Sequence, residues 1–158
     1  MSTVFKEINL SYLESIADGD REIIKELIVI FLEQIPEFTE GMQSAFEKED
    51  WRVLAGLAHK AKSSVLSMGM NDLGNIDLKN LELIAKTFRI EVLDQSQTKT
   101  EREAEELENL KRSLLSYPVE KQEWLKANAS KQSMKNIIDK FISACATACG
   151  ELKHVLEN

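Results

Sequence analysis

Apolar residues recur every three or four positions along most of the chain, which is the pattern of amphipathic helices. The pattern predicts a long helix over residues 20–49, preceded by a short helix over residues 9–17. Pro36 falls inside the long helix. Because an interior proline removes a backbone donor and clashes with the preceding turn, we expect a kink there and not a break. The apolar stripe of the long helix is Ile24, Leu27, Phe31, Ile35, Phe38, Met42 and either Ala45 or Phe46.

Two more helices follow closely. The first is predicted over residues 50–68, between a capping Asp50 and Gly69, which can adopt the left-handed conformation that ends helices. The second is predicted over residues 71–89, and its periodicity directs the polar Asp77 and Asn80 inward. These side chains must pair across the fold, or the helical register must shift locally. The inward positions are Leu54, Ala58, Ala61, Val65 and Met68 in the first helix and Leu73, Leu81, Ile84 and Phe88 in the second.

Residues 90–130 differ in character, because a polar segment and two shorter helices, over residues 101–116 and 120–129, replace the long stripes. A long apolar stripe resumes in the last helix, over residues 131–156. We therefore predict one all-α domain over residues 1–158, built as an antiparallel four-helix bundle. The bundle helices are residues 20–49, 50–68, 71–89 and 131–156, with a short N-terminal capping helix and a helical insertion over residues 90–130 before the last bundle helix.

Charge and composition narrow the function. The 27 acidic and 20 basic residues give a net charge of -7, which argues against nucleic-acid binding. No apolar run approaches the roughly 18 residues of a membrane span, and the N-terminus lacks signal-peptide features, so we expect a cytoplasmic protein that does not bind membranes. The start at Met1 favours a freestanding protein. Cys145 and Cys149 are expected to be reduced, and with His154 they lack the fourth ligand of a metal site.

His59 is one of two histidines, and periodicity turns it away from the core stripe of its helix. At about 100° per residue the stripe lies within roughly 40° of one direction, whereas His59 points about 140° away from it. The side chains around it are mostly small, so the backbone of a partner can approach closely. The exposed side is predicted to comprise Arg52, Ala55, Gly56, Ser63 and Leu66 around His59.

The neighbourhood of His59 suggests phosphoryl chemistry. A neutral imidazole is an available nucleophile at cellular pH, and its free nitrogen can attack phosphorus. Lys62 lies on the adjoining flank of the helix, where its ammonium group can stabilise a phosphoryl group on that nitrogen. Lys60 points about 100° to the other side, where it is expected to steer an acidic partner. His154 has no lysine three residues later and is expected to be an ordinary surface residue.

One motif is formed by Ala58-His59-Lys60-Ala61-Lys62-Ser63-Ser64, with Gly69 ten residues after the histidine, Leu73 fourteen after it and Leu81-Glu82 beyond. This motif resembles the histidine-containing phosphotransfer (HPt) domain of two-component phosphorelays. Gly19-Asp20, the Leu27 to Phe38 helix with its proline, and Asp50-Trp51 with Leu54 extend the likeness. The resemblance covers about residues 8–88, and the final helix by pattern alone.

The resemblance implies a phosphocarrier and not an enzyme. By matching position, His59 accepts a phosphoryl group from the aspartate of a receiver domain and passes it to another receiver, Lys62 supports that group, and Ser64 fills a slot for a small residue. The expected partners are response-regulator receivers or a hybrid histidine kinase. The chain needs no cofactor of its own, since the receiver brings Mg²⁺. The alternative is a non-phosphorylated helical adaptor that binds a receiver or another partner through the His59 face.

Two positions depart from the family pattern. Ser63 stands where glycine is frequent, which makes a partner's approach slightly less close. The Leu81-Glu82 pair comes one residue later than the pattern places it, which leaves open whether Glu82 or Asp77 orients the second ring nitrogen of His59. The insertion is a third difference, and its role is not readable from the sequence.

Overall fold

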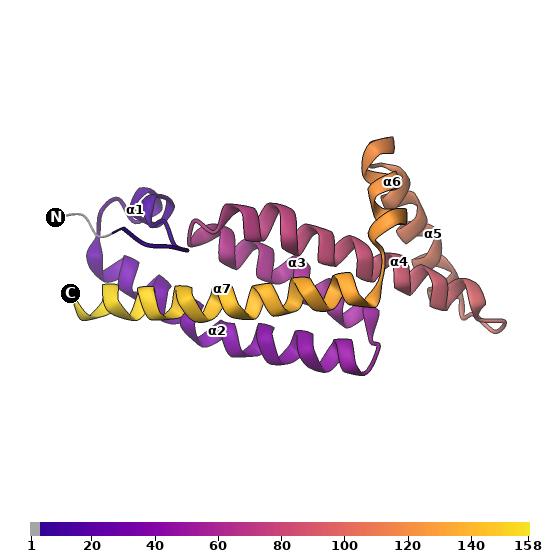
Figure 1. The fold of residues 1–158 in the computed structure, drawn as a ribbon, viewed down its shortest axis with the longest axis horizontal. Coiled ribbons are helices and arrows are strands. Elements are labelled where there is room, and N and C mark those ends of the chain that lie inside the picture. The colour runs from indigo at the N-terminus through magenta and orange to yellow at the C-terminus, as the bar shows by residue number, and fades with distance from the viewer. Residues whose placement is uncertain (1–3) are drawn as a thin grey trace.

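The computed structural model describes residues 4–158, and within that range it contains helices and no strand, which confirms the all-α prediction. Four long helices lie side by side as an antiparallel bundle (Figure 1). In chain order the elements are α1 (Ser11–Ile16), α2 (Arg21–Glu47), α3 (Trp51–Ser67), the π-helical η1 (Leu73–Leu78), α4 (Lys79–Gln95), α5 (Glu101–Leu115), α6 (Val119–Asn128) and α7 (Lys131–Glu157). The bundle consists of α2, α3, α4 with η1, and α7.

Each bundle helix contributes its apolar stripe to one continuous core. Phe38 of α2, Leu54 of α3, Ile84 of α4 and Phe141 of α7 are each fully buried. Burying a side chain of this size contributes roughly 1.5–3 kcal/mol, so the stripes account for most of the bundle's cohesion. Core packing therefore buries one face of α3 and leaves much of the opposite face exposed.

Side chains cap the bundle helices where the sequence predicts them. The carboxylate of Asp20 accepts hydrogen bonds from the amides of Glu22 and Ile23, and that of Asp50 accepts one from the amide of Val53 at 3.3 Å. α2 continues through Pro36 without a break, as predicted, and the Thr39 hydroxyl donates a hydrogen bond to the carbonyl oxygen of Ile35. A long helix therefore survives its interior proline.

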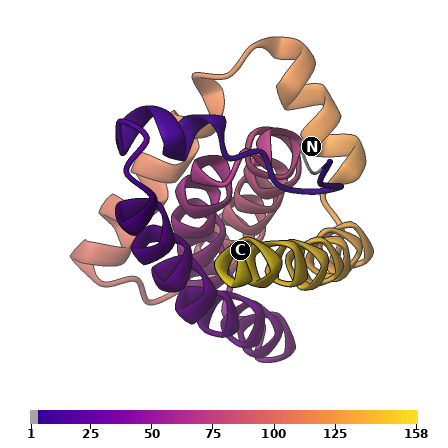
Figure 2. The ribbon, with the colours of Figure 1, turned by 90° about the vertical axis from the view of Figure 1, so that its left-hand side faces the viewer.

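Gly69 lies in the turn that follows α3, where the N-terminal segment packs against it. Its φ is +79°, a left-handed conformation, and a Cβ atom there would lie 2.3 Å from the carbonyl oxygen of Asn9. Only glycine satisfies both demands. The amide of Asn9 donates to the carbonyl of Met68 at 2.9 Å, so the segment before α1 crosses the end of the bundle at this point (Figure 2).

The third bundle helix begins with a π-helical turn and ends later than predicted. It runs to Gln95 and not to residue 89, because Leu93 continues the apolar spacing and is 1% exposed. The two inward polar residues both find cationic partners: the carboxylate of Asp77 lies 2.9 Å from Lys140 of α7, and the amide oxygen of Asn80 accepts from Lys121 of α6. Pairing and a register change therefore both occur here.

The two insertion helices flank the four-helix bundle, and Leu125 of α6 joins its core. α5 packs against α4, and α6 extends away from the bundle axis beside it (Figures 1 and 2). The Thr100 hydroxyl and the Glu103 carboxylate form a reciprocal capping box at the start of α5. The insertion is thus an ordered addition to one side of α4 at one end of the molecule.

Candidate functional site

His59 lies on the outer face of α3, as the helical periodicity predicts. Its side chain is 74% exposed, whereas Ala58 and Ala61 on either side of it are fully buried. The small buried alanines let α3 sit close to its neighbours, so the imidazole stands near the side chains of α4 while it remains open to solvent.

One ring nitrogen of His59 is held by a buried carboxylate. The distance from His59 Nδ1 to Glu82 Oε1 of α4 is 3.1 Å, and Glu82 is only 2% exposed. The other carboxylate oxygen, Oε2, accepts a hydrogen bond of 2.7 Å from Lys86 Nζ, one helical turn further along α4. The three side chains therefore form a chain of contacts from a partly buried ammonium group to an exposed imidazole.

Burial disfavours the charged form of Glu82, yet the hydrogen bond and charge of Lys86, with the hydrogen bond from His59, outweigh it and lower the pKa of Glu82 below its usual value. The carboxylate is therefore ionised at neutral pH and can only accept hydrogen bonds. In the neutral imidazole, Nδ1 must then carry the proton, so the lone pair is on Nε2. This arrangement leaves a single nucleophilic nitrogen.

The π-helical turn explains how Glu82 reaches His59. A π turn bonds residue i to i+5 and takes one residue more than an α turn, so it shifts the register of everything that follows. Leu81-Glu82 comes one residue late in the sequence, and η1 over Leu73–Leu78 absorbs that residue before α4 begins. Asp77, the other candidate, contacts Lys140 on α7 instead.

The remaining predicted residues lie around His59 in different environments. Gly56 and Ser63 are exposed, and a Cβ atom on Gly56 would meet nothing within 4 Å. Lys62 is half-buried on the flank of the helix. Lys60 Nζ lies 3.5 Å from Glu37 of α2, in a pair exposed on both sides, and the Ser64 hydroxyl donates to Gln34 of α2 at 3.1 Å. Ser64 thus joins α3 to α2.

Two side chains that periodicity places on the exposed side are covered. Ala55 is only 7% exposed, and it lines a hollow together with Glu82 and Lys86 of α4. Leu66 is half-buried, because it packs on Gly74 of η1, where an added Cβ atom would lie 2.8 Å from it. A helical wheel treats α3 alone, so it misses the cover that α4 and η1 provide.

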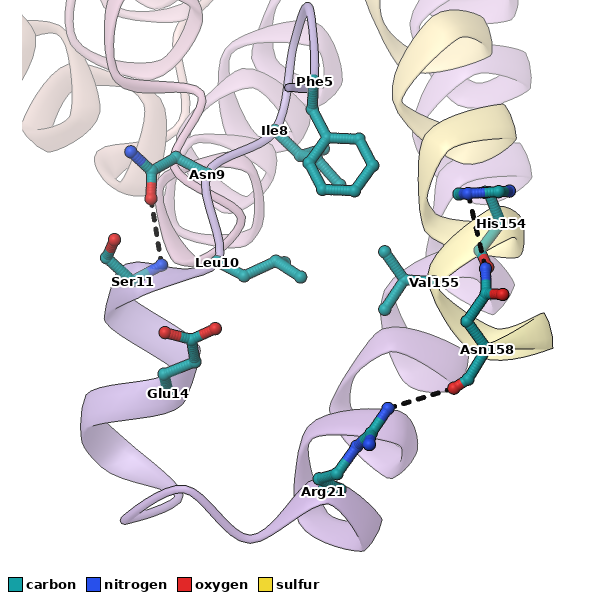
Figure 3. Close-up of a pocket in the computed structure, with 10 residues that line it drawn as sticks. All are labelled: Phe5, Ile8, Asn9, Leu10, Ser11, Glu14, Arg21, His154, Val155 and Asn158. Atoms are coloured by element: carbon teal, nitrogen blue, oxygen red, sulfur yellow. Dashed lines mark hydrogen bonds between the residues drawn. The ribbon is translucent and has the colours of Figure 1, made fainter. Parts of the chain in front are cut away.

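His154 lies in a different setting, in a hollow of about 940 Å³ between the N-terminal segment, α1 and the end of α7 (Figure 3). Its ring contacts the Asn158 amide at 3.3 Å, and no carboxylate backs it among the described residues. In residues 4–158 no group of three or more His, Cys, Asp and Glu side chains is placed to hold a metal ion. His59 is therefore the histidine whose surroundings prepare it for chemistry.

Sequence reasoning missed Lys86 as part of this site. A signal was present, since glutamate followed four residues later by lysine is the favoured pairing on a helix surface. It also missed Arg89 and Glu106, which lie beside the site and bond to each other across α4 and α5. No periodicity reveals that contact, because it depends on where the insertion folds.

Comparisons with known proteins give one match. The family model described as Hpt domain matches residues 26–140 of the chain. A search of curated proteins and a search of solved structures found no match. None of the helices in residues 4–158 is long and apolar enough to cross a membrane.

Replacing Lys86 with methionine should destabilise the fold in a pH-dependent way. Above the unfolded pKa of about 4.5, Glu82 is left as a buried carboxylate without its cation, and we expect a loss of about 1–3 kcal/mol in the free energy of unfolding at pH 7. The contribution of the ion pair is complete above the unfolded pKa and is lost as the pH falls through the lowered folded pKa of Glu82, so the loss should shrink progressively in acid. Urea unfolding of the wild type, Lys86→Met and the matched Lys86→Arg at pH 7 and pH 3.5 measures this.

Lys86→Arg should retain most of the stability, because its guanidinium keeps the charge. A loss in Lys86→Met that is equal at both pH values would show that the methionine disturbs packing alone and that the ion pair contributes nothing.

Proposed function

The chain belongs to the Hpt domain family, and we propose that it is a phosphorelay intermediate in which His59 accepts a phosphoryl group from the aspartate of a receiver domain and passes it to another receiver. Hpt domains act in phosphotransfer within two-component signalling. The observation that supports His59 as the acceptor is its contact with the ionised, buried carboxylate of Glu82, which leaves Nε2 as the nucleophile on an exposed ring.

The proposed phosphoryl transfer takes place at Nε2 of His59. The Nε2 lone pair forms the N–P bond while the O–P bond of the aspartyl phosphate breaks and the aspartate carboxylate leaves. Because Nδ1 keeps its proton, the ring becomes a cation, and the negative charge of Glu82 stabilises it at 3.1 Å. Glu82 acts here by orienting the ring and compensating its charge. The reverse step passes the phosphoryl group to a second receiver.

Lys62 and the receiver complete the proposed chemistry. Lys62 follows His59 by one helical turn, close enough for its flexible ammonium group to reach a phosphoryl group on Nε2. In this proposal the receiver supplies Mg²⁺ and most of the acidic pocket, so this chain supplies the nucleophile and its support and acts as a carrier. The partners are response-regulator receivers or a hybrid histidine kinase.

Gly56 indicates how the receiver docks. It lies in the middle of α3, where glycine costs about 1 kcal/mol relative to alanine, and nothing in the fold occupies the space of its missing Cβ. The packing of this chain does not require glycine there. A small residue there leaves room for a partner to approach α3 closely beside His59. Ser63 and the weakly paired Lys60 lie on the same exposed face and extend the proposed contact surface.

The direct test is labelling by phosphorylated receivers. The chain is incubated with Mg²⁺ and each receiver domain of the same cell, charged with radioactive phosphate. We expect acid-labile, alkali-stable label on the wild type and on the His154→Gln control, and none on His59→Gln, because only His59 offers a prepared nitrogen. Equal label on His59→Gln, or no label on the wild type from any receiver, would contradict the proposal. Stable binding of receivers without label would instead support the adaptor.

A bulky residue at position 56 should block docking without unfolding the bundle. Gly56→Arg projects into open space, so thermal unfolding should stay within a few degrees of the wild type, while the transfer rate at limiting receiver should fall at least tenfold. Gly56→Ala is the matched control: it should be more stable by about 1 kcal/mol and transfer at nearly the normal rate. Normal transfer by Gly56→Arg would mean that the receiver approaches from another side.

A further inference from the structure

A hollow of about 360 Å³ lies directly beside His59, and the insertion forms one of its walls. α3 provides one side and α5 the opposite side, with α4 as the floor between them. The lining residues are Arg52, Ala55, Gly56 and His59 of α3, Glu82, Lys86 and Arg89 of α4, and Glu106 and Leu110 of α5. We call this hollow the α3–α5 groove.

The α5 wall is fixed in place. Arg89 donates two parallel hydrogen bonds to the carboxylate of Glu106, from Nε at 2.7 Å and from Nη2 at 3.0 Å. Both side chains are largely buried. This bidentate contact lowers the pKa of Glu106 and raises that of Arg89, so the pair is charged at neutral pH. Leu107 of α5, one residue on, is buried against the rest of the fold. These contacts hold α5 against α4 at the level of the groove.

The groove offers an apolar contact next to a cation. Leu110 of α5 is half-buried and faces the groove beside Ala55 and Gly56. Arg52 at the edge is exposed, and its charge reaches Glu106, but it forms no ion pair with another described residue. An apolar side chain with a neighbouring carboxylate complements these two features.

A partner that reaches His59 must also cover this groove. A specific protein interface buries about 800 Å² on each partner, a patch roughly 30 Å across. A hollow of a few hundred cubic ångströms that His59 itself lines is far narrower than such a patch. A receiver centred on His59 therefore contacts the α5 wall unless it is displaced entirely toward α2.

We infer that the insertion helix α5 is part of the docking surface: the α3–α5 groove receives a segment of the receiver domain that exchanges phosphoryl groups with His59, with an apolar side chain on Leu110 and a carboxylate on Arg52. This inference rests on the proposed function. It gives the insertion a role in choosing among receivers, because only a receiver with a segment of matching shape and charge fits beside the fixed wall.

Two variants change the groove without touching the nucleophile or its support. Leu110→Glu places a carboxylate against the incoming apolar group, and Arg52→Ala removes the exposed cation. For the receiver that labels the wild type fastest, we expect kcat/KM for transfer to fall at least tenfold in Leu110→Glu and threefold to tenfold in Arg52→Ala. The matched controls on the outer surface of the same insertion, Leu115→Glu and Arg112→Ala, should transfer at the wild-type rate, since neither residue lines the groove.

Direct labelling with phosphoramidate, a small donor that needs no docking, separates docking from chemistry. All four variants should accept phosphate from it on His59 as the wild type does, and circular dichroism should show that they are folded. Wild-type transfer by both groove variants with every receiver would overturn the inference and leave the proposed function intact. Failure of every receiver to label the wild type would remove the proposed function, and this inference with it.

Discussion

The carboxylate of Glu82 determines the character of this site. It is the one polar or charged residue that is buried within residues 4–158, and a buried charge is expensive unless it is paired and hydrogen-bonded. Lys86 supplies the charge and His59 the second hydrogen bond. The same contacts that make burial of Glu82 tolerable also fix the proton of His59 on Nδ1. Stability and chemistry therefore depend on one interaction.

Several features of the fold bring Glu82 and His59 together. The alanines of α3 bring the helix close to α4, and the π-helical η1 shifts the register so that Glu82 points at α3. Gly74 within η1 has no Cβ atom, which permits the close contact of this turn with Leu66 of α3. π turns occur often at functional sites, because they re-aim side chains without breaking a helix. Here the π turn places Glu82 within hydrogen-bond distance of His59, although Glu82 comes one residue late in the sequence.

The bundle and the orientation of His59 could be predicted from the sequence, because both follow from one helix's periodicity at a time. Caps at Asp20 and Asp50 and the left-handed Gly69 are equally local. The choice between Glu82 and Asp77 was not predictable, because it depends on a π turn that periodicity does not reveal. The prediction that Ala55 is exposed was wrong for a related reason, because the packing of α4 beside α3 is not visible in the periodicity of α3 alone. The α5 wall depends on the contact of Arg89 with Glu106, which only the folded insertion creates.

In the proposed transfer, the contact with Glu82 leaves Nε2 of His59 as the nucleophile. Nitrogen-15 NMR of protein phosphorylated by a receiver measures this directly, since long-range proton–nitrogen correlations identify which ring nitrogen carries phosphorus. We expect the phosphoryl group on Nε2 of His59, with a proton retained on Nδ1 toward Glu82. A phosphoryl group on Nδ1 of His59, or on either nitrogen of His154, would contradict it.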